Sequence, residues 1–163
     1  QDIDAIYLSH IHPDHYDERY FNYPRNIPIY ILKSKYNFLF KNLVQKGYTN
    51  VREIDSGITV RFKEAKITIF SPFSANVFHS TGIDNFIDSA IVIQDENGTS
   101  AFNANDNKPD KESCKFLRDK FGNFDLAIAK ACFSSLLATA IKANFLLLPL
   151  AIIRWYNSLQ ALL

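Results

Sequence analysis

The chain has 163 residues, 47% of them hydrophobic, and 18 basic residues against 17 acidic ones give a net charge of +1. A chain of this size can bury one core, so we expect one domain or part of one. The near-neutral charge excludes the electrostatic footprint of a nucleic-acid-binding protein. Two cysteines are too few for a disulfide scaffold. Residues 1–4 have neither the basic n-region nor the hydrophobic h-region of a secretory signal. We therefore expect a reducing, cytoplasmic setting.

Strand and helix signals alternate along the first half of the chain. The apolar run at 2–8 predicts a strand, and 26–32 predicts another that is entered through a proline. Ser34 is a candidate N-cap for a helix with one apolar stripe, which Gly47 closes. Three short strands are expected next, at 51–54, 58–62 and 67–70.

The second half repeats this alternation after a loop at 71–85, whose length favours a functional role. An Asn-Gly turn predicts a hairpin between strands at 89–94 and 100–104. A helix follows Asp110 and ends at Gly122, and we expect it to turn four residues inward, namely Cys114, Phe116, Leu117 and Phe121. A last strand is expected at 124–128, and the whole pattern indicates an α/β class.

The segment Ser9-His10-Ile11-His12-Pro13-Asp14-His15 has the outline of a metal site, because it holds three of the four histidines and a carboxylate. Successive side chains of an extended chain alternate, so His10 and His12 project to one side. Imidazole nitrogens suit zinc and carboxylates suit harder ions, so a mixed set accepts zinc, manganese or iron. Asp14 and His15 can serve a second ion. The alternative is a polar turn whose histidines only cap or contact solvent.

Asp106 is a further candidate ligand, since it follows the apolar strand expected at 100–104. A carboxylate at a strand end can emerge beside the histidine loop, and its two oxygens can bind two ions. The alternative is an Asx turn or a cap near the start of the next helix.

The pattern H-x-H-x-D-H at 10–15 closely resembles the second motif of the metallo-β-lactamase superfamily, and Asp106 resembles its metal-bridging aspartate. The resemblance covers about residues 2–125. Within the superfamily, the patterns at 8–12, 88–93 and 103–106 resemble the lactamase-like domain of CMP-N-acetylneuraminate hydroxylase and its bacterial relatives. The Rieske ligand pairs of that family are absent, so hydroxylation does not follow. The fold implied is a metallo-β-lactamase-like αββα sandwich, incomplete at the N-terminus and with an atypical C-terminal tail.

The resemblance implies a metal-dependent hydrolase that uses a metal-activated water molecule, with Zn²⁺ as one or two ions and Mn²⁺ or iron as alternatives. His10 and His12 would hold one ion, Asp14 and His15 the other, and Asp106 would bridge them. Asp14 would also position or deprotonate the water. The substrate is expected to be a small molecule, for which phosphoesters, lactones, thioesters and amides all suit such a centre. The alternative is an inactive fragment or a non-catalytic metal-binding module with an incomplete ligand set.

Two departures from the superfamily pattern bear on that alternative. The third ligand of the first site, normally a histidine shortly before the strand at 89–94, is matched by either His79 or Asp84. The superfamily's final histidine, expected after Asp125, is missing, because no histidine follows His79.

We expect the chain to be a fragment that lacks the first strands of its first sheet, because it has no methionine and begins within an expected strand. The domain is assigned to residues 1–125. Residues 126–163 form an apolar tail, non-native or helical, with three basic residues and neither acidic residues nor glycine. A membrane helix at 131–153 and a buried helix are two interpretations. A shifted reading frame or truncated gene is the third, and we favour it.

Overall fold

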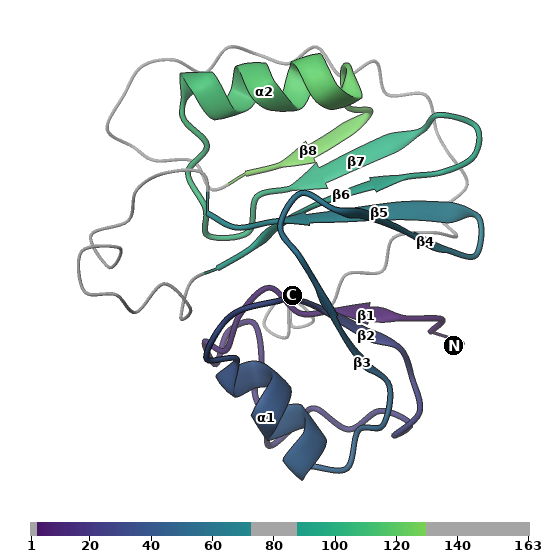
Figure 1. Cartoon of the computed structure of the whole chain (residues 1–163), viewed down its shortest axis with the longest axis vertical. Helices are drawn as coiled ribbons and strands as arrows, with labels where there is room; N and C mark the ends of the chain where they lie inside the picture. The colour runs from purple at the N-terminus through teal and green to yellow at the C-terminus, as the bar shows by residue number, and fades with distance from the viewer. Residues whose placement is uncertain (1–2, 73–87, 130–163) are drawn as a thin grey trace, which may run out of the picture.

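The computed structural model describes residues 3–72 and 88–129. Within these ranges the chain forms four layers, with a helix on the outer side of each of two packed sheets (Figure 1). The first sheet has the order β1-β2-β3 and the second the order β4-β5-β6-β7-β8. This is the αββα sandwich that the sequence predicts.

The first sheet is parallel and consists of β1 (Ile6–Tyr7), β2 (Ile29–Leu32) and β3 (Val51–Ile54). Helix α1 (Phe38–Gln45) covers it and buries Leu39 and Leu43. The helix begins later than the sequence predicted, because Asn37 and not Ser34 is its N-cap, with a side chain that accepts a hydrogen bond from the Phe40 amide at 3.1 Å.

The second sheet is antiparallel from β4 to β7, whereas β8 (Leu126–Ile128) pairs with β7 in parallel. Its other strands are β4 (Thr59–Phe62), β5 (Ala65–Phe70), β6 (Ala90–Gln94) and β7 (Ser100–Asn103). The expected hairpin joins β6 to β7, and only Gly98 of its Asn-Gly pair has a positive φ, at 89°. The strand expected at 124–128 is therefore present, in shorter form, as β8.

Strands β5 and β6 bury residues on both faces because each face is covered. Ile69 and Ile91 point into the core between the sheets, which also contains Tyr30 and Ile54 of the first sheet. The alternate residues of these strands pack with Leu117 under the second helix, and they include Phe70, Ala90 and Val92. The alternation of side chains along these strands thus contributes to two of the three hydrophobic clusters of the described residues.

Helix α2 (Lys111–Phe121) lies over the second sheet, with Asp110 as its N-cap and Gly122 at its end (Figure 1). The expectation that four of its residues turn inward was wrong for two of them, since Cys114 is exposed and Phe116 is 47% exposed. Leu117 is buried, and Phe121, one helical turn further on, packs partly against the same core. A single short helix face meets the sheet here, so it buries fewer residues than the apolar count suggested.

Several predictions from the sequence fall outside the described residues, namely the ligand choice between His79 and Asp84 and the tail from residue 130 onward. The division of the chain at residue 125 stays a prediction, although β8 extends the sheet to Ile128. Among the described residues, the structure has no helix that is both long and apolar enough to cross a membrane.

Candidate metal centre

The histidine segment begins directly after β1 and turns back on itself. The carbonyl of His12 accepts hydrogen bonds from the backbone amides of His15 and Tyr16 at 2.9 and 2.8 Å. This turn brings the His15 ring to within 4.3 Å of the His10 ring, measured between centroids. The sequence spacing therefore produces a compact loop in which all three imidazoles gather.

Asp106 approaches this loop from the other sheet, just past the end of β7. The turn that carries it contains Asn105, which has a left-handed backbone with φ of 53°. The Asn105 amide donates to the Asn103 side chain at 2.9 Å, which is an Asx turn. The ends of β1 and β7 thus present side chains to one place, although 91 positions separate His15 from Asp106 in the sequence.

The five predicted site residues all lie in this cluster. The Nε2 atom of His10 lies 2.7 Å from His12 Nδ1 and 3.9 Å from Asp106 Oδ2. The Nε2 atom of His15 lies 3.6 Å from the same Asp106 oxygen and 3.6 Å from Asp14 Oδ2. Asp106 therefore stands between two pairs of side chains, His10 with His12 and His15 with Asp14.

The donor atoms form two groups of three, His10 with His12 and Asp106, and Asp14 with His15 and Asp106. Within each group the atoms lie within 4.8 Å of one another. The first group has two imidazoles and one carboxylate and the second has one imidazole and two carboxylates, and zinc, manganese and iron accept such mixed sets. Exposure rises from the His10 side chain at 1% to Asp14 at 63%, so the cluster opens to solvent on the Asp14 side. The residues present fit a metal ion.

Several solved structures have an architecture similar to that of this chain. A metallo-β-lactamase fold protein, YhfI from Bacillus subtilis, superimposes with a TM-score of 0.54 at 18% identity, over 77% of this chain and 48% of that one. The chain has the metallo-β-lactamase fold. No protein-family model and no curated protein matches the sequence.

Two other structures with this architecture are similar to the chain. A possible metal-dependent hydrolase from Veillonella parvula gives a TM-score of 0.58 at 14% identity, over 73% of this chain and 45% of that one. CmlA, a diiron β-hydroxylase from Streptomyces venezuelae, gives a TM-score of 0.59 at 17% identity, over 77% of this chain and 25% of that one. The chain spans less than half the length of each of the three proteins.

A partly buried polar network supports the cluster within this metallo-β-lactamase fold. The Tyr7 hydroxyl lies 2.7 Å from Ser89 Oγ and donates to the Ser89 carbonyl at 2.8 Å. The side-chain amide of Asn105 donates from Nδ2 to the Tyr7 hydroxyl at 3.1 Å and to the Ser89 carbonyl at 2.6 Å. Burial raises the pKa of Tyr7 well above its usual value, so the hydroxyl keeps its proton. The network ties β1, β6 and β7 together beneath the candidate ligands.

We predict that Asn105→Ala is more destabilising than Asn105→Gly. Both variants lose the side-chain hydrogen bonds and must adopt the same left-handed backbone. Only alanine has a Cβ that makes this conformation unfavourable, at a cost of roughly 1–2 kcal/mol. The free energy of unfolding from urea denaturation measures both. Asn97→Ala, at an exposed turn position, is the control and should change it by less than about 0.5 kcal/mol. Equal losses for alanine and glycine would show that the backbone conformation of Asn105 is not what holds this turn.

The sequence reasoning did not assign site roles to the residues that surround the candidate ligands. Asp88 lies 3.0 Å from His10 Nδ1, and Ser9 Oγ lies 3.0 Å from the same atom. The signal available for Asp88 was a charged residue next to the apolar strand at 89–94. The loop before that strand gave no means of placing it beside His10.

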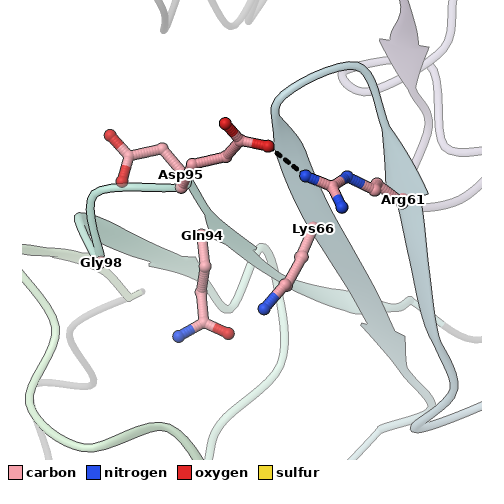
Figure 2. A pocket seen from close by; sticks show the side chains of 6 residues that line it. Arg61, Lys66, Gln94, Asp95 and Gly98 are labelled. Atoms are coloured by element: carbon pink, nitrogen blue, oxygen red, sulfur yellow. Dashed lines mark hydrogen bonds and ion pairs between the residues drawn. The ribbon is translucent and has the colours of Figure 1, made fainter.

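A hollow of about 420 Å³, drawn in Figure 2, lies where β6 ends at Gln94. It is lined by Arg61, Lys66, Gln94, Asp95, Glu96 and Gly98. Arg61, from which a dashed line is drawn in Figure 2, pairs with Glu96, and no histidine or cysteine lines the hollow. This hollow has no set of ligands for a transition metal, so the candidate site stays with the histidine cluster.

Proposed function

We propose that the chain carries the metal centre of a hydrolase that attacks its substrate with a metal-activated water molecule. The observation that carries this proposal is the position of one Asp106 oxygen, which lies 3.9 Å from His10 Nε2 and 3.6 Å from His15 Nε2. A carboxylate within reach of two sets of donors can contribute to both ions of a two-ion hydrolytic site. The neighbour described as a possible metal-dependent hydrolase supports this chemistry.

The proposed roles follow from the exposure and position of each side chain. His10 and His12 with Asp106 hold the more buried ion, while Asp14 and His15 with Asp106 hold the more exposed one. When bound, a divalent ion supplies Lewis acidity and lowers the pKa of a coordinated water toward neutrality. Asp14, on the open side, orients that water and accepts its proton.

Zn²⁺ is the proposed ion, because imidazole-rich sets with carboxylates are typical of catalytic zinc. Mn²⁺ and iron are the alternatives, and the diiron neighbour CmlA supports iron as one of them. The proposed substrate is a small molecule with a phosphoester, lactone, thioester or amide bond, and the donor set does not distinguish among these four. The proposed compartment is the cytoplasm, where an exposed free thiol such as Cys114 stays reduced.

A non-catalytic metal-binding module is the second candidate. It is favoured by the small number of donors, since each described group offers three and the histidine expected after Asp125 is missing. Three protein ligands plus water are enough for a catalytic zinc ion, but the same set can hold a metal without any turnover.

Metal analysis combined with an activity panel tests the proposal. The full chain is prepared metal-free, reconstituted with Zn²⁺, Mn²⁺ or Fe²⁺, and assayed against an activated phosphodiester, a lactone, a thioester and an anilide. We expect hydrolysis of at least one substrate that needs the metal and is abolished in Asp106→Ala. Bound metal without hydrolysis of any substrate would favour the binding module, and a chain that takes up no metal contradicts both.

A further inference from the structure

Asp88 is a buried carboxylate on the inner side of the candidate metal centre. Its side chain is 10% exposed, and neither of its oxygens has an aligned hydrogen-bond donor among the described residues. A buried carboxylate without a donor is costly, because it loses the hydration that it has in the unfolded chain. The nitrogen that faces it is His10 Nδ1, at 3.0 Å from Asp88 Oδ1.

The His10 ring lies between Asp88 and the other candidate ligands. Its Nδ1 atom is on the side of Asp88, while its Nε2 atom faces His12 Nδ1 at 2.7 Å and Asp106 Oδ2 at 3.9 Å. A neutral imidazole carries one N–H and one lone pair. Hydrogen on Nδ1 therefore leaves the lone pair on Nε2, where a metal ion would need it.

The chain fixes Asp88 in this place through the residue that follows it. Ser89 is fully buried, and its hydroxyl donates to the Ser9 carbonyl at 2.9 Å. That bond joins the segment before β6 to the segment before His10. The carboxylate is therefore held against the imidazole by a buried hydrogen bond between their neighbours and not only by its own contact.

We propose that Asp88 is a positioning residue of the metal centre, whose carboxylate accepts hydrogen from His10 Nδ1 and fixes the ring with Nε2 toward the metal. This inference rests on the proposed function, because it assumes that His10 is a ligand. Outer carboxylates of this kind orient a histidine ligand and increase its basicity.

Ser9 is the competing partner of the same nitrogen. Its hydroxyl lies 3.0 Å from His10 Nδ1, but it also lies 3.3 Å from His15 Nδ1, so it is shared between two rings. A carboxylate is a stronger acceptor from an N–H group than a hydroxyl is. Removing the Ser9 hydroxyl should therefore lower Zn²⁺ affinity less than removing the Asp88 charge does.

Zinc affinity and thermal stability of the full chain test the proposal together. In Asp88→Asn we expect Zn²⁺ affinity, measured by competition with a chromophoric chelator, to fall about 10–100-fold. The melting temperature of the metal-free variant should stay the same or rise, because the amide oxygen can still accept from His10 Nδ1 while the variant no longer buries a carboxylate charge. Asp119→Asn, exposed on α2, is the matched control and should change neither quantity.

The opposite results overturn the inference. An affinity lowered less than about threefold would remove the positioning role, and so would a loss of metal-free stability that accompanies the loss of affinity, because Asp88 would then be a structural group. A larger affinity loss in Ser9→Ala than in Asp88→Asn would assign the role to the hydroxyl.

The tautomer of His10 gives a readout that needs no metal. Long-range ¹H–¹⁵N spectra of the metal-free chain should show hydrogen on His10 Nδ1, with that preference weakened in Asp88→Asn, whose amide can present either oxygen or NH₂. Hydrogen on Nε2 in the unmodified chain contradicts the inference. A chain with the Nδ1 tautomer that binds no metal would contradict the proposed function but not the contact between Asp88 and His10.

Discussion

Asp106→Ala is expected to abolish metal binding by both donor groups while leaving the fold intact. Asp106 is the residue that the two groups share, and it lies in a turn after β7 and outside the three hydrophobic clusters. We expect metal affinity to fall more than about 100-fold, beyond the loss that a change behind a ligand causes. Elemental analysis after dialysis gives the metal content per chain.

His12→Ala sharpens this prediction because His12 belongs to one group only. We expect this variant to keep metal at Asp14, His15 and Asp106 and to lose it at His10 and His12. The added stability that metal gives to the folded chain should disappear in Asp106→Ala and be reduced in His12→Ala. Asp55→Ala, an exposed carboxylate paired with Lys33, serves as the control. Full metal content in both variants would show that the ligand assignment is wrong.

Ile69→Ala is expected to have the largest effect on stability. Ile69 lies in β5, is 0% exposed, and packs between the two sheets. Truncating a buried isoleucine removes its transfer free energy and leaves a cavity, which together cost roughly 2–5 kcal/mol. The side chain is no part of the metal cluster, so metal affinity measured below the unfolding transition should not change.

Val44→Ala is the matched control for this core substitution. Val44 is 48% exposed on α1, and we expect the free energy of unfolding to change by less than about 0.5 kcal/mol. Urea denaturation at several wavelengths measures both variants. A loss at Ile69 no larger than the one at Val44 would mean that the two sheets do not pack as described.

Most of the described fold could be predicted because periodicity is a local property. The strand at 51–54 is β3 as expected, and the Asn-Gly pair at 97–98 correctly predicted the turn between β6 and β7. The start of α1 was placed three residues early, at Ser34, because Asn37 is an equally good cap and only packing decides between them. Cys114 was expected to be buried, but it is exposed. An apolar residue on a short helix need not face the sheet.

The candidate ligands could be chosen from the sequence because the motif at 10–15 is dense and Asp106 directly follows a strand. The residues behind them could not, since Tyr7 belongs to the first sheet while Ser89 and Asn105 lie beside strands of the second, so they meet only after the sheets pack. Tyr7, Ser89 and Asn105 are 16 to 98 positions apart from their partners in the network. In the sequence, Asp88 is a charged residue at the start of a strand, as many others are. Only the structure shows that it lies beside His10.

A crystal structure of the full chain, grown with Zn²⁺ and recorded at the zinc absorption edge, would locate the bound ion. We predict an anomalous peak bounded by His10 Nε2, His12 Nδ1 and Asp106, and a second one, where two ions bind, near Asp14 and His15. Zinc bound elsewhere, with this cluster lacking an anomalous peak, would contradict the assignment of the metal centre.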